Sequence, residues 1–179
     1  MQDKALAILR ANAVMAVATL GPDGWPQNTM VSYVSDGLLV YFLISRSSRK
    51  FANLQRNNRV SIAIGGDFVS TRDIQGLSMA AWAAEVRHEP IRSSLVRRLS
   101  DGHGGNFDAD ALDFTTSALF RARPSLISVV DFAATPTDAA ESLPVGPLTV
   151  GPGDLCEMHP AATPDWARDP EASGPVYGG

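Results

Sequence analysis

The residues LLVYFLISRSSRK at positions 38–50 join a strand to a helix, and this junction decides the fold. Leu38 to Ile44 are apolar at every position, which is typical of a strand covered on both faces. The period then changes, and the pattern predicts a helix over residues 46–57 that Ser47 or Ser48 can cap. We therefore expect a central strand that leads directly into a capped helix.

The sequence around this junction predicts short strands with a few helices between them. Gly-Pro-Asp-Gly at 21–24 and Asp-Gly at 36–37 are turn sequences that separate strands. The expected strands are 14–20, 26–34, 38–44, 60–64, 77–86, 119–123 and 126–132, with Pro124 between the last two, and the expected helices are 2–11, 46–57, 90–99 and 108–116. Six or seven strands with inserted helices indicate a mainly β protein that forms an antiparallel barrel.

The charge balance changes near residue 133. Residues 1–132 carry 14 basic and 12 acidic residues, whereas residues 133–179 carry one basic and seven acidic residues and eight of the 12 prolines. Proline removes a backbone donor and fixes φ, so this composition disfavours regular structure. We expect one domain over 1–132, followed over 133–179 by a Pro/Gly-rich acidic C-terminal tail that is either solvated or laid as an arm over a partner.

Composition also excludes several classes of protein. The longest apolar run has seven residues, whereas a bilayer-spanning helix needs about 20. A net charge of −4 argues against general nucleic-acid binding, and a single cysteine, Cys156, allows no intramolecular disulfide. Asp108, Asp110 and Asp113 fit the first turn of a helix better than a metal site. We expect a cytoplasmic protein with no membrane segment, no nucleic-acid partner and no metal.

A group of cations surrounds the start of the helix expected at 46–57. Five of them have no acidic residue nearby in the sequence: Arg46, Arg49, Lys50, Arg56 and Arg59. A helix N-terminus exposes unpaired N–H groups and a partial positive charge. Serine hydroxyls and cationic side chains added there would make a phosphate-binding site. The residues alone also fit a solvated basic helix face, so both interpretations stay open.

Several short sequences occur along the chain in a characteristic order. They are MAVATL at 15–20, GPDGWP at 21–26, MVSY at 30–33, LVYF at 39–42, SRK at 48–50, NL at 53–54, NRVS at 58–61, AEV at 84–86, FRARP at 120–124 and SVVD at 128–131. In this order they resemble the pyridoxamine 5′-phosphate oxidase-like FMN-binding split-barrel family, especially its general-stress-protein branch. The tail lies outside the resemblance.

The resemblance implies a split β-barrel that forms a homodimer, with two FMN molecules at the subunit interface, each touched by both chains. Ser48, Arg49 and Lys50 match the residues that hold the FMN phosphate in the family. The remaining cofactor-binding residues that the resemblance implies are Asn28, Thr29, Met30, Val31, Leu43, Ile44, Ser45 and Gln75, with Leu77 as an alternative to Gln75.

The resemblance also implies a flavin-dependent oxidoreductase that acts on a small-molecule substrate. Asn28 and Tyr33 stand where the oxidase itself has Arg and Lys, which argues against oxidation of pyridoxamine phosphate. No catalytic residue is identified. The alternatives are a non-catalytic flavin-binding stress-response module, or a split barrel that uses the deazaflavin F420 or haem.

Each alternative cofactor has its own sequence requirement. The polyglutamate chain of F420 would need basic surface such as Arg56, Arg59 and Arg72, and haem would need an axial ligand among His88, His103 and His159. The acidic tail is expected to fold over residues 46–59, where Trp166 would cover the flavin edge, unless it is a solvated extension.

Overall fold

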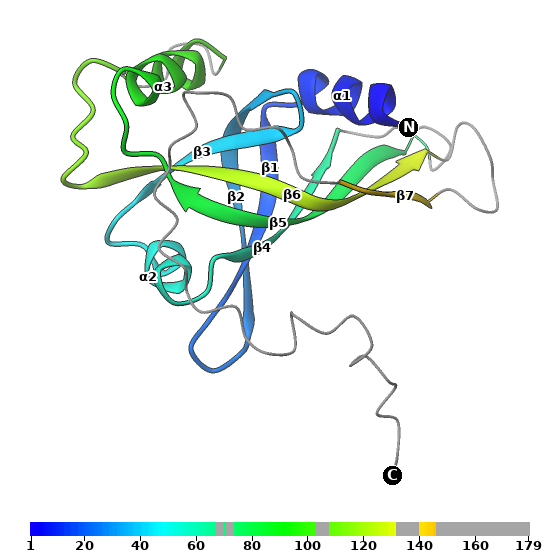
Figure 1. Ribbon diagram of the computed structural model, residues 1–179, viewed down its shortest axis with the longest axis horizontal. Helices are drawn as coiled ribbons and strands as arrows, with labels where there is room; N and C mark the ends of the chain where they lie inside the picture. The colour runs from blue at the N-terminus through cyan, green and yellow to red at the C-terminus, as the bar shows by residue number, and fades with distance from the viewer. Residues whose placement is uncertain (67–69, 71–73, 103–107, 132–139, 146–179) are drawn as a thin grey trace.

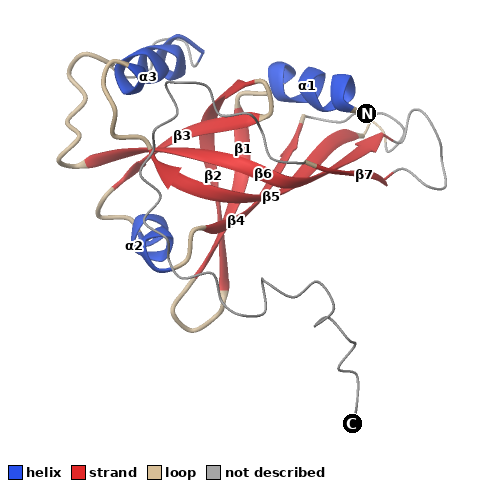
Figure 2. Ribbon diagram, viewed as in Figure 1, coloured by secondary structure: helices blue, strands red, loops and turns tan. Residues whose placement is uncertain are grey.

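The computed structural model describes residues 1–66, 70, 74–102, 108–131 and 140–145. Its strands, in chain order, are β1 (Val14–Leu20), β2 (Pro26–Asp36), β3 (Leu39–Ser45), β4 (Arg59–Gly65), β5 (Gln75–Glu85), β6 (Ser117–Asp131) and β7 (Ala140–Pro144). Its helices are α1 (Gln2–Ala11), α2 (Arg49–Arg56) and α3 (Ile91–Gly102). Figure 1 shows this order by colour, and Figure 2 shows the helices lying outside the strands.

Six of the strands close into an antiparallel barrel. The sheet runs β3-β2-β1-β4-β5-β6-β7, and β3 also pairs with β6, so the two ends of the six-strand section meet. The register of this closing pair runs from Val40 opposite Ala122 to Ser45 opposite Ser117. The expected mainly β fold with a split barrel is therefore confirmed, and the strand at 38–44 is central because it pairs on both edges.

The barrel interior is filled by alternate residues of the strands. Along β1, burial alternates with the period of two that a strand requires, and Met15 and Val17 have no exposed surface. A second apolar cluster lies between α3 and the outer side of β3, around Tyr41 and Leu99. The barrel is thus covered at this outer side, while much of the remaining outer surface of the sheet carries no helix (Figure 2).

Two details of the expected secondary structure are wrong. Residues 108–116 form turns instead of a helix, because Asp108 Oδ1 accepts the N–H of Asp110 (2.9 Å) and Asp113 Oδ1 accepts the N–H of Thr115 (2.7 Å). These local bonds compete with helical hydrogen bonds. The two strands expected on either side of Pro124 are one strand, β6, in which a register shift opposite Ala80 and Ala81 accommodates the proline.

The short strand β7 extends the ordered sheet into the region expected to be a tail. It pairs antiparallel with β6, from Leu126 opposite Pro144 to Val130 opposite Ala140. The N–H of Val145 then donates to the carbonyl oxygen of Ser125 at 3.0 Å. Residues 140–144 of the sequence beyond residue 132 therefore form a short strand.

Candidate functional site

The junction between β3 and α2 is held by a serine cap. The Ser48 hydroxyl accepts the N–H of Phe51 (3.2 Å) and donates to the carbonyl oxygen of Ser45 (2.6 Å). The N–H of Ser48 also donates to that carbonyl oxygen at 3.1 Å. The cap satisfies one N–H of the first helical turn. The N–H groups of Arg49 and Lys50 have no partner within the helix and point out of its N-terminal end. The expected capped helix start is therefore present.

Three of the five cations, Arg46, Arg49 and Lys50, lie at the start of α2 and fall into two groups. Arg46 forms an ion pair with Glu85, donates from Nε to the carbonyl oxygen of Phe114 (2.9 Å), and lies 5.1 Å from the centre of the Phe51 ring. Arg46 is therefore neutralised by an acid 39 residues away, a pairing that the neighbouring sequence does not reveal.

Arg49 and Lys50 form the second group. Neither is paired with a carboxylate in the part of the chain that the structure describes. Lys50 is half-buried, and burial lowers the pKa of its ammonium group. A partly desolvated ammonium without a carboxylate is unfavourable by itself and would be stabilised by an added anion. The two side chains and two backbone N–H groups at this helix start can therefore bind a phosphate.

Two strands part next to α2. β2 and β3 pair only from Tyr33–Phe42 to Asp36–Leu39 in the described sheet. Before Tyr33, β2 pairs with β1, and after Phe42, β3 pairs with β6. The residues expected to touch the cofactor on β2 (28–31) and on β3 (43–45) therefore lie on the two strands that separate at this point.

One buried polar atom lies on the separating part of β2. Thr29 Oγ1 has no exposed surface and no hydrogen-bond partner among the described residues. Thr29 is opposite Val17 on β1, and two residues further along β1 the Thr19 hydroxyl accepts a hydrogen bond from Asn53 of α2 (3.0 Å). An unpaired buried hydroxyl costs free energy that a polar ligand could recover. The role of Thr29 in cofactor binding stays a prediction, and its hydroxyl is a polar atom that still lacks a partner among the described residues.

The other expected residues lie in different environments. Asn28 and Met30 are exposed on the outer face of β2, and Ser45 is exposed at the end of β3, where its hydroxyl contacts that of Ser47 at 2.8 Å. Leu43 is half-buried beneath α3, and Ile44 is buried in the barrel. These two residues can contribute packing, but their side chains are occupied by core contacts.

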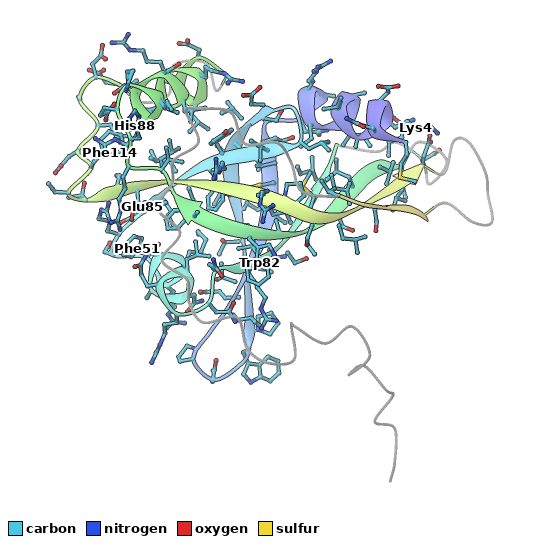
Figure 3. The ribbon with its side chains drawn as sticks, in the orientation of Figure 1. Lys4, Phe51, Trp82, Glu85, His88 and Phe114 are labelled. Atoms are coloured by element: carbon cyan, nitrogen blue, oxygen red, sulfur yellow. The ribbon has the colours of Figure 1, made fainter. Side chains whose placement is uncertain are left out.

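Gln75 lies far from the start of α2 within one chain. Its Nε2 donates to Asp131 (3.3 Å), which also pairs with Lys4 of α1 at 2.9 Å. Gln75 stands ten residues before Glu85 on β5, a separation of about 33 Å along an extended strand. Because Glu85 contacts Arg46, Gln75 and the α2 start are at opposite ends of the barrel. Figure 3 shows Lys4, which shares Asp131 with Gln75, and Glu85 on opposite sides of the molecule.

Glu85 anchors the α2 start to β5. Its carboxylate pairs with both Arg46 and Arg87, and only 8% of its side chain is exposed. Burial alone would raise the pKa of Glu85, but hydrogen bonds and charge from Arg87 and Arg46 outweigh it and lower the pKa below the usual value of 4.5. Figure 3 shows Glu85 on the same side of the molecule as Phe51 and Phe114.

Replacing this carboxylate should change how stability depends on pH. A lowered pKa means that Glu85 stabilises the fold above pH 4.5 and that this contribution is lost as the pH falls through the folded-state pKa, below 4.5. E85Q is expected to reduce the free energy of unfolding at pH 7 by about 1–3 kcal/mol, and the difference from the unaltered protein should shrink below pH 4. Urea unfolding between pH 3 and 7 measures this.

The control is E89Q, which removes an exposed carboxylate that pairs with Arg92 at 2.5 Å. Exposed pairs contribute about 0–1 kcal/mol, so E89Q should have the smaller effect at pH 7. Equal losses in E85Q and E89Q, or an E85Q deficit that persists at pH 3, would show that Glu85 does not hold the junction.

A surface of small, uncharged side chains lies on the outside of the barrel and was not predicted from the sequence. Small residues from β1, β4 and β5 form its centre: Ala16, Ala18, Ser61, Ala63, Ser78 and Ala80. Large apolar side chains at its edges are unusually exposed, namely Met30 (67%), Val14 (42%) and Leu126 (40%). We call this surface the small-residue face. Its signal in the sequence is the alternation of small residues with buried apolar residues on neighbouring strands.

Metal and membrane features can be assessed for the described residues. They contain no group of three His, Cys, Asp or Glu residues that could hold a metal ion. His88 is exposed beyond the end of β5. None of the helices that the structure describes is long and apolar enough to cross a membrane. The remaining candidates, Cys156, His103, His159, Arg72 and Trp166, lie outside the described residues.

Residues 1–131 match the family described as pyridoxamine 5′-phosphate oxidase. The fold is similar to three solved structures at 18–21% identity. The haem storage protein HutZ from Vibrio cholerae has 21% identity and a TM-score of 0.59, covering 69% of this chain and 89% of HutZ. An FAD-binding protein from Mesorhizobium loti has 18% identity and a TM-score of 0.60, covering 72% of this chain and 93% of that protein. An F420 reductase has 20% identity and a TM-score of 0.56, covering 68% of this chain and 94% of the reductase. Three different cofactors are therefore named for proteins with this fold.

Proposed function

This chain belongs to the pyridoxamine 5′-phosphate oxidase family, and we propose that it binds FMN and acts as a flavin-dependent oxidoreductase on a small-molecule substrate. The observation that carries the proposal is the start of α2. There, Arg49 and Lys50 lie beside a serine-capped helix N-terminus with no carboxylate paired to them in the described chain. A phosphate monoester supplies the anion that this arrangement lacks.

Different residues of the site would bind different parts of the cofactor. Arg49, Lys50 and the backbone N–H groups of the first α2 turn would hold the phosphate, and Ser48 would keep those groups in place through its cap. The hydroxyl of Thr29 would hydrogen-bond a polar group of the cofactor. Bound FMN supplies hydride or electron transfer, so the protein needs to position it and control its surroundings.

We propose that the active form is a homodimer that packs through the small-residue face. Small side chains let two sheets approach closely, and the six central residues carry no charge, which removes the main cost of burying them. Gln75 could then meet the α2 start only from the second copy, since the two lie at opposite ends of one barrel. This division supports a cofactor site completed by both chains.

The site does not support oxidation of pyridoxamine phosphate. Tyr33 stands at one of the positions where the resemblance implies a basic residue, and its side chain is buried with its hydroxyl donating to the carbonyl oxygen of Leu9 (2.9 Å). Burial raises the pKa of Tyr33 to about 12, so its phenol stays neutral at physiological pH. A neutral, buried phenol cannot replace a cation that contacts an anionic substrate.

The absorption spectrum of the purified protein tests the cofactor directly. FMN, F420 and haem have distinct visible spectra, so each alternative gives its own result. A flavin spectrum that is bleached by a reduced nicotinamide and restored by an added oxidant supports an oxidoreductase. A flavin spectrum without turnover under any donor supports a non-catalytic flavin-binding module, and a haem or F420 spectrum contradicts the FMN proposal.

A further inference from the structure

Three side chains form a basic and aromatic stripe across the outside of the sheet. Arg59 of β4 is opposite Trp82 of β5, and Trp82 is opposite Arg123 of β6. Directly opposed side chains on one face of an antiparallel sheet lie about 5 Å apart at Cβ, so Trp82 stands between two arginine side chains. All three are half-buried, and Figure 3 shows Trp82 on the barrel wall. We call these residues the Arg–Trp–Arg stripe.

The stripe has the chemistry of a binding surface for an acidic chain. Arg59 donates from Nε to Asn57 Oδ1 at 3.3 Å, which orients its guanidinium. Arg123 is paired with no carboxylate among the described residues. An indole between cations can pack against proline rings while the guanidinium groups bind carboxylates. The stripe therefore suits an acidic, proline-containing segment.

An acidic, proline-containing segment, residues 146–179, begins close to the stripe. β7 runs antiparallel to β6 and ends with Pro144 opposite Leu126, after which Val145 bonds to Ser125. Val145, the last residue that the structure describes, therefore lies beside β6 two residues from Arg123. The sequence that follows, residues 146–179, contains five acidic residues, one basic residue and six prolines.

We propose that residues 146–179 dock on the Arg–Trp–Arg stripe of their own chain. The stripe spans two strand spacings, about 10 Å. Asp154, the first acidic residue after Val145, is nine residues along the chain, about 30 Å when extended, so the acidic part of the segment can reach the whole stripe. Arg46 is already paired with Glu85, so a carboxylate of residues 146–179 would gain little by binding it. The docking therefore leaves the α2 start open to an anionic ligand, and it is independent of which cofactor binds there.

The test uses the full chain and its single cysteine, Cys156, which lies in the docking segment. A nitroxide spin label on Cys156 reports by EPR whether the segment is held or moves freely. We expect a slow-motion component in the unaltered protein at 50 mM salt. This component should decrease at 1 M salt, where the Debye length is about 3 Å.

Variants then locate the docking site. R59S/R123S is expected to shift the ratio of held to free segment about three- to tenfold toward free, since each exposed ion pair contributes modestly. R10S, which removes an exposed arginine from α1, should leave the spectrum unchanged. If R59S/R123S does not fold, D154N/E157Q removes charge from the segment itself and should have the same effect.

The outcomes decide the proposal. A spectrum that is equally fast in the unaltered protein and in R59S/R123S shows that the segment is solvated, and overturns it. Release by R49S/K50S but not by R59S/R123S shows that the segment covers the α2 start, and also overturns it. FMN binding is measured on the same samples, so a failure of the cofactor proposal is seen separately.

Discussion

R49A/K50A is expected to bind FMN about two to four orders of magnitude more weakly than the unaltered protein. Each charge-assisted contact to a phosphate contributes about 1.5–3 kcal/mol, and the variant removes two of them. The two side chains have no carboxylate paired to them in the described structure, so their removal breaks no ion pair within the chain. Thermal stability without cofactor should change little. Fluorescence titration with FMN gives the dissociation constants.

The matched control is R10A/R56A. It also removes two positive charges, but Arg10 lies in the last turn of α1 and Arg56 in the last turn of α2, away from its capped start. If the effect came from net charge alone, the control would lose as much affinity as R49A/K50A. An R49A/K50A dissociation constant within threefold of the unaltered protein would instead show that the phosphate binds elsewhere.

The start of α2 shows what local sequence can predict. Ser48 caps the helix through a bond to a residue three positions away, and the apolar run before it makes a strand. Both signals lie within a few residues, and the structure agrees with them. The pairing of Arg46 with Glu85 was not predictable in this way, because it depends on how β5 is placed against β3 and β6.

Two predictions from local sequence are wrong: the division of a strand at Pro124 and the helix at 108–116. Pro124 was expected to divide two strands because proline removes a ladder hydrogen bond. The register shift next to it absorbs that loss, and such shifts depend on the partner strand and not on the proline itself. Along 108–116, the aspartates were expected to favour the first turn of a helix, but their side chains accept hydrogen bonds from nearby N–H groups and favour turns.

The small-residue face was missed because each strand that forms it looks ordinary by itself. Ala63 alternates with buried Ile62 and Ile64, as expected for a strand with one buried face. Only the register brings Ala63 next to Ala16 on one side and Ser78 on the other. The absence of charge across three strands is then visible, and it is a property of the sheet, not of any one segment.

A63E is expected to convert the protein to a monomer and to abolish tight FMN binding. Ala63 lies at the centre of the small-residue face with its side chain exposed in the single chain, so glutamate there should be tolerated by the monomer fold. In a two-fold dimer the substitution occurs twice in one interface and would bury two carboxylates without partners. Leaving charges buried and unpaired costs several kcal/mol each. Sedimentation velocity measures the association state.

A7E provides the matched control, because Ala7 is exposed on α1, away from this face, and receives the same side chain. It should remain dimeric and bind FMN normally, with circular dichroism confirming that both variants are folded. A dimer that survives A63E would place the interface elsewhere. A folded A63E monomer that binds FMN tightly would show that one chain completes the site, so that Gln75, at the far end of the same barrel, has no part in it.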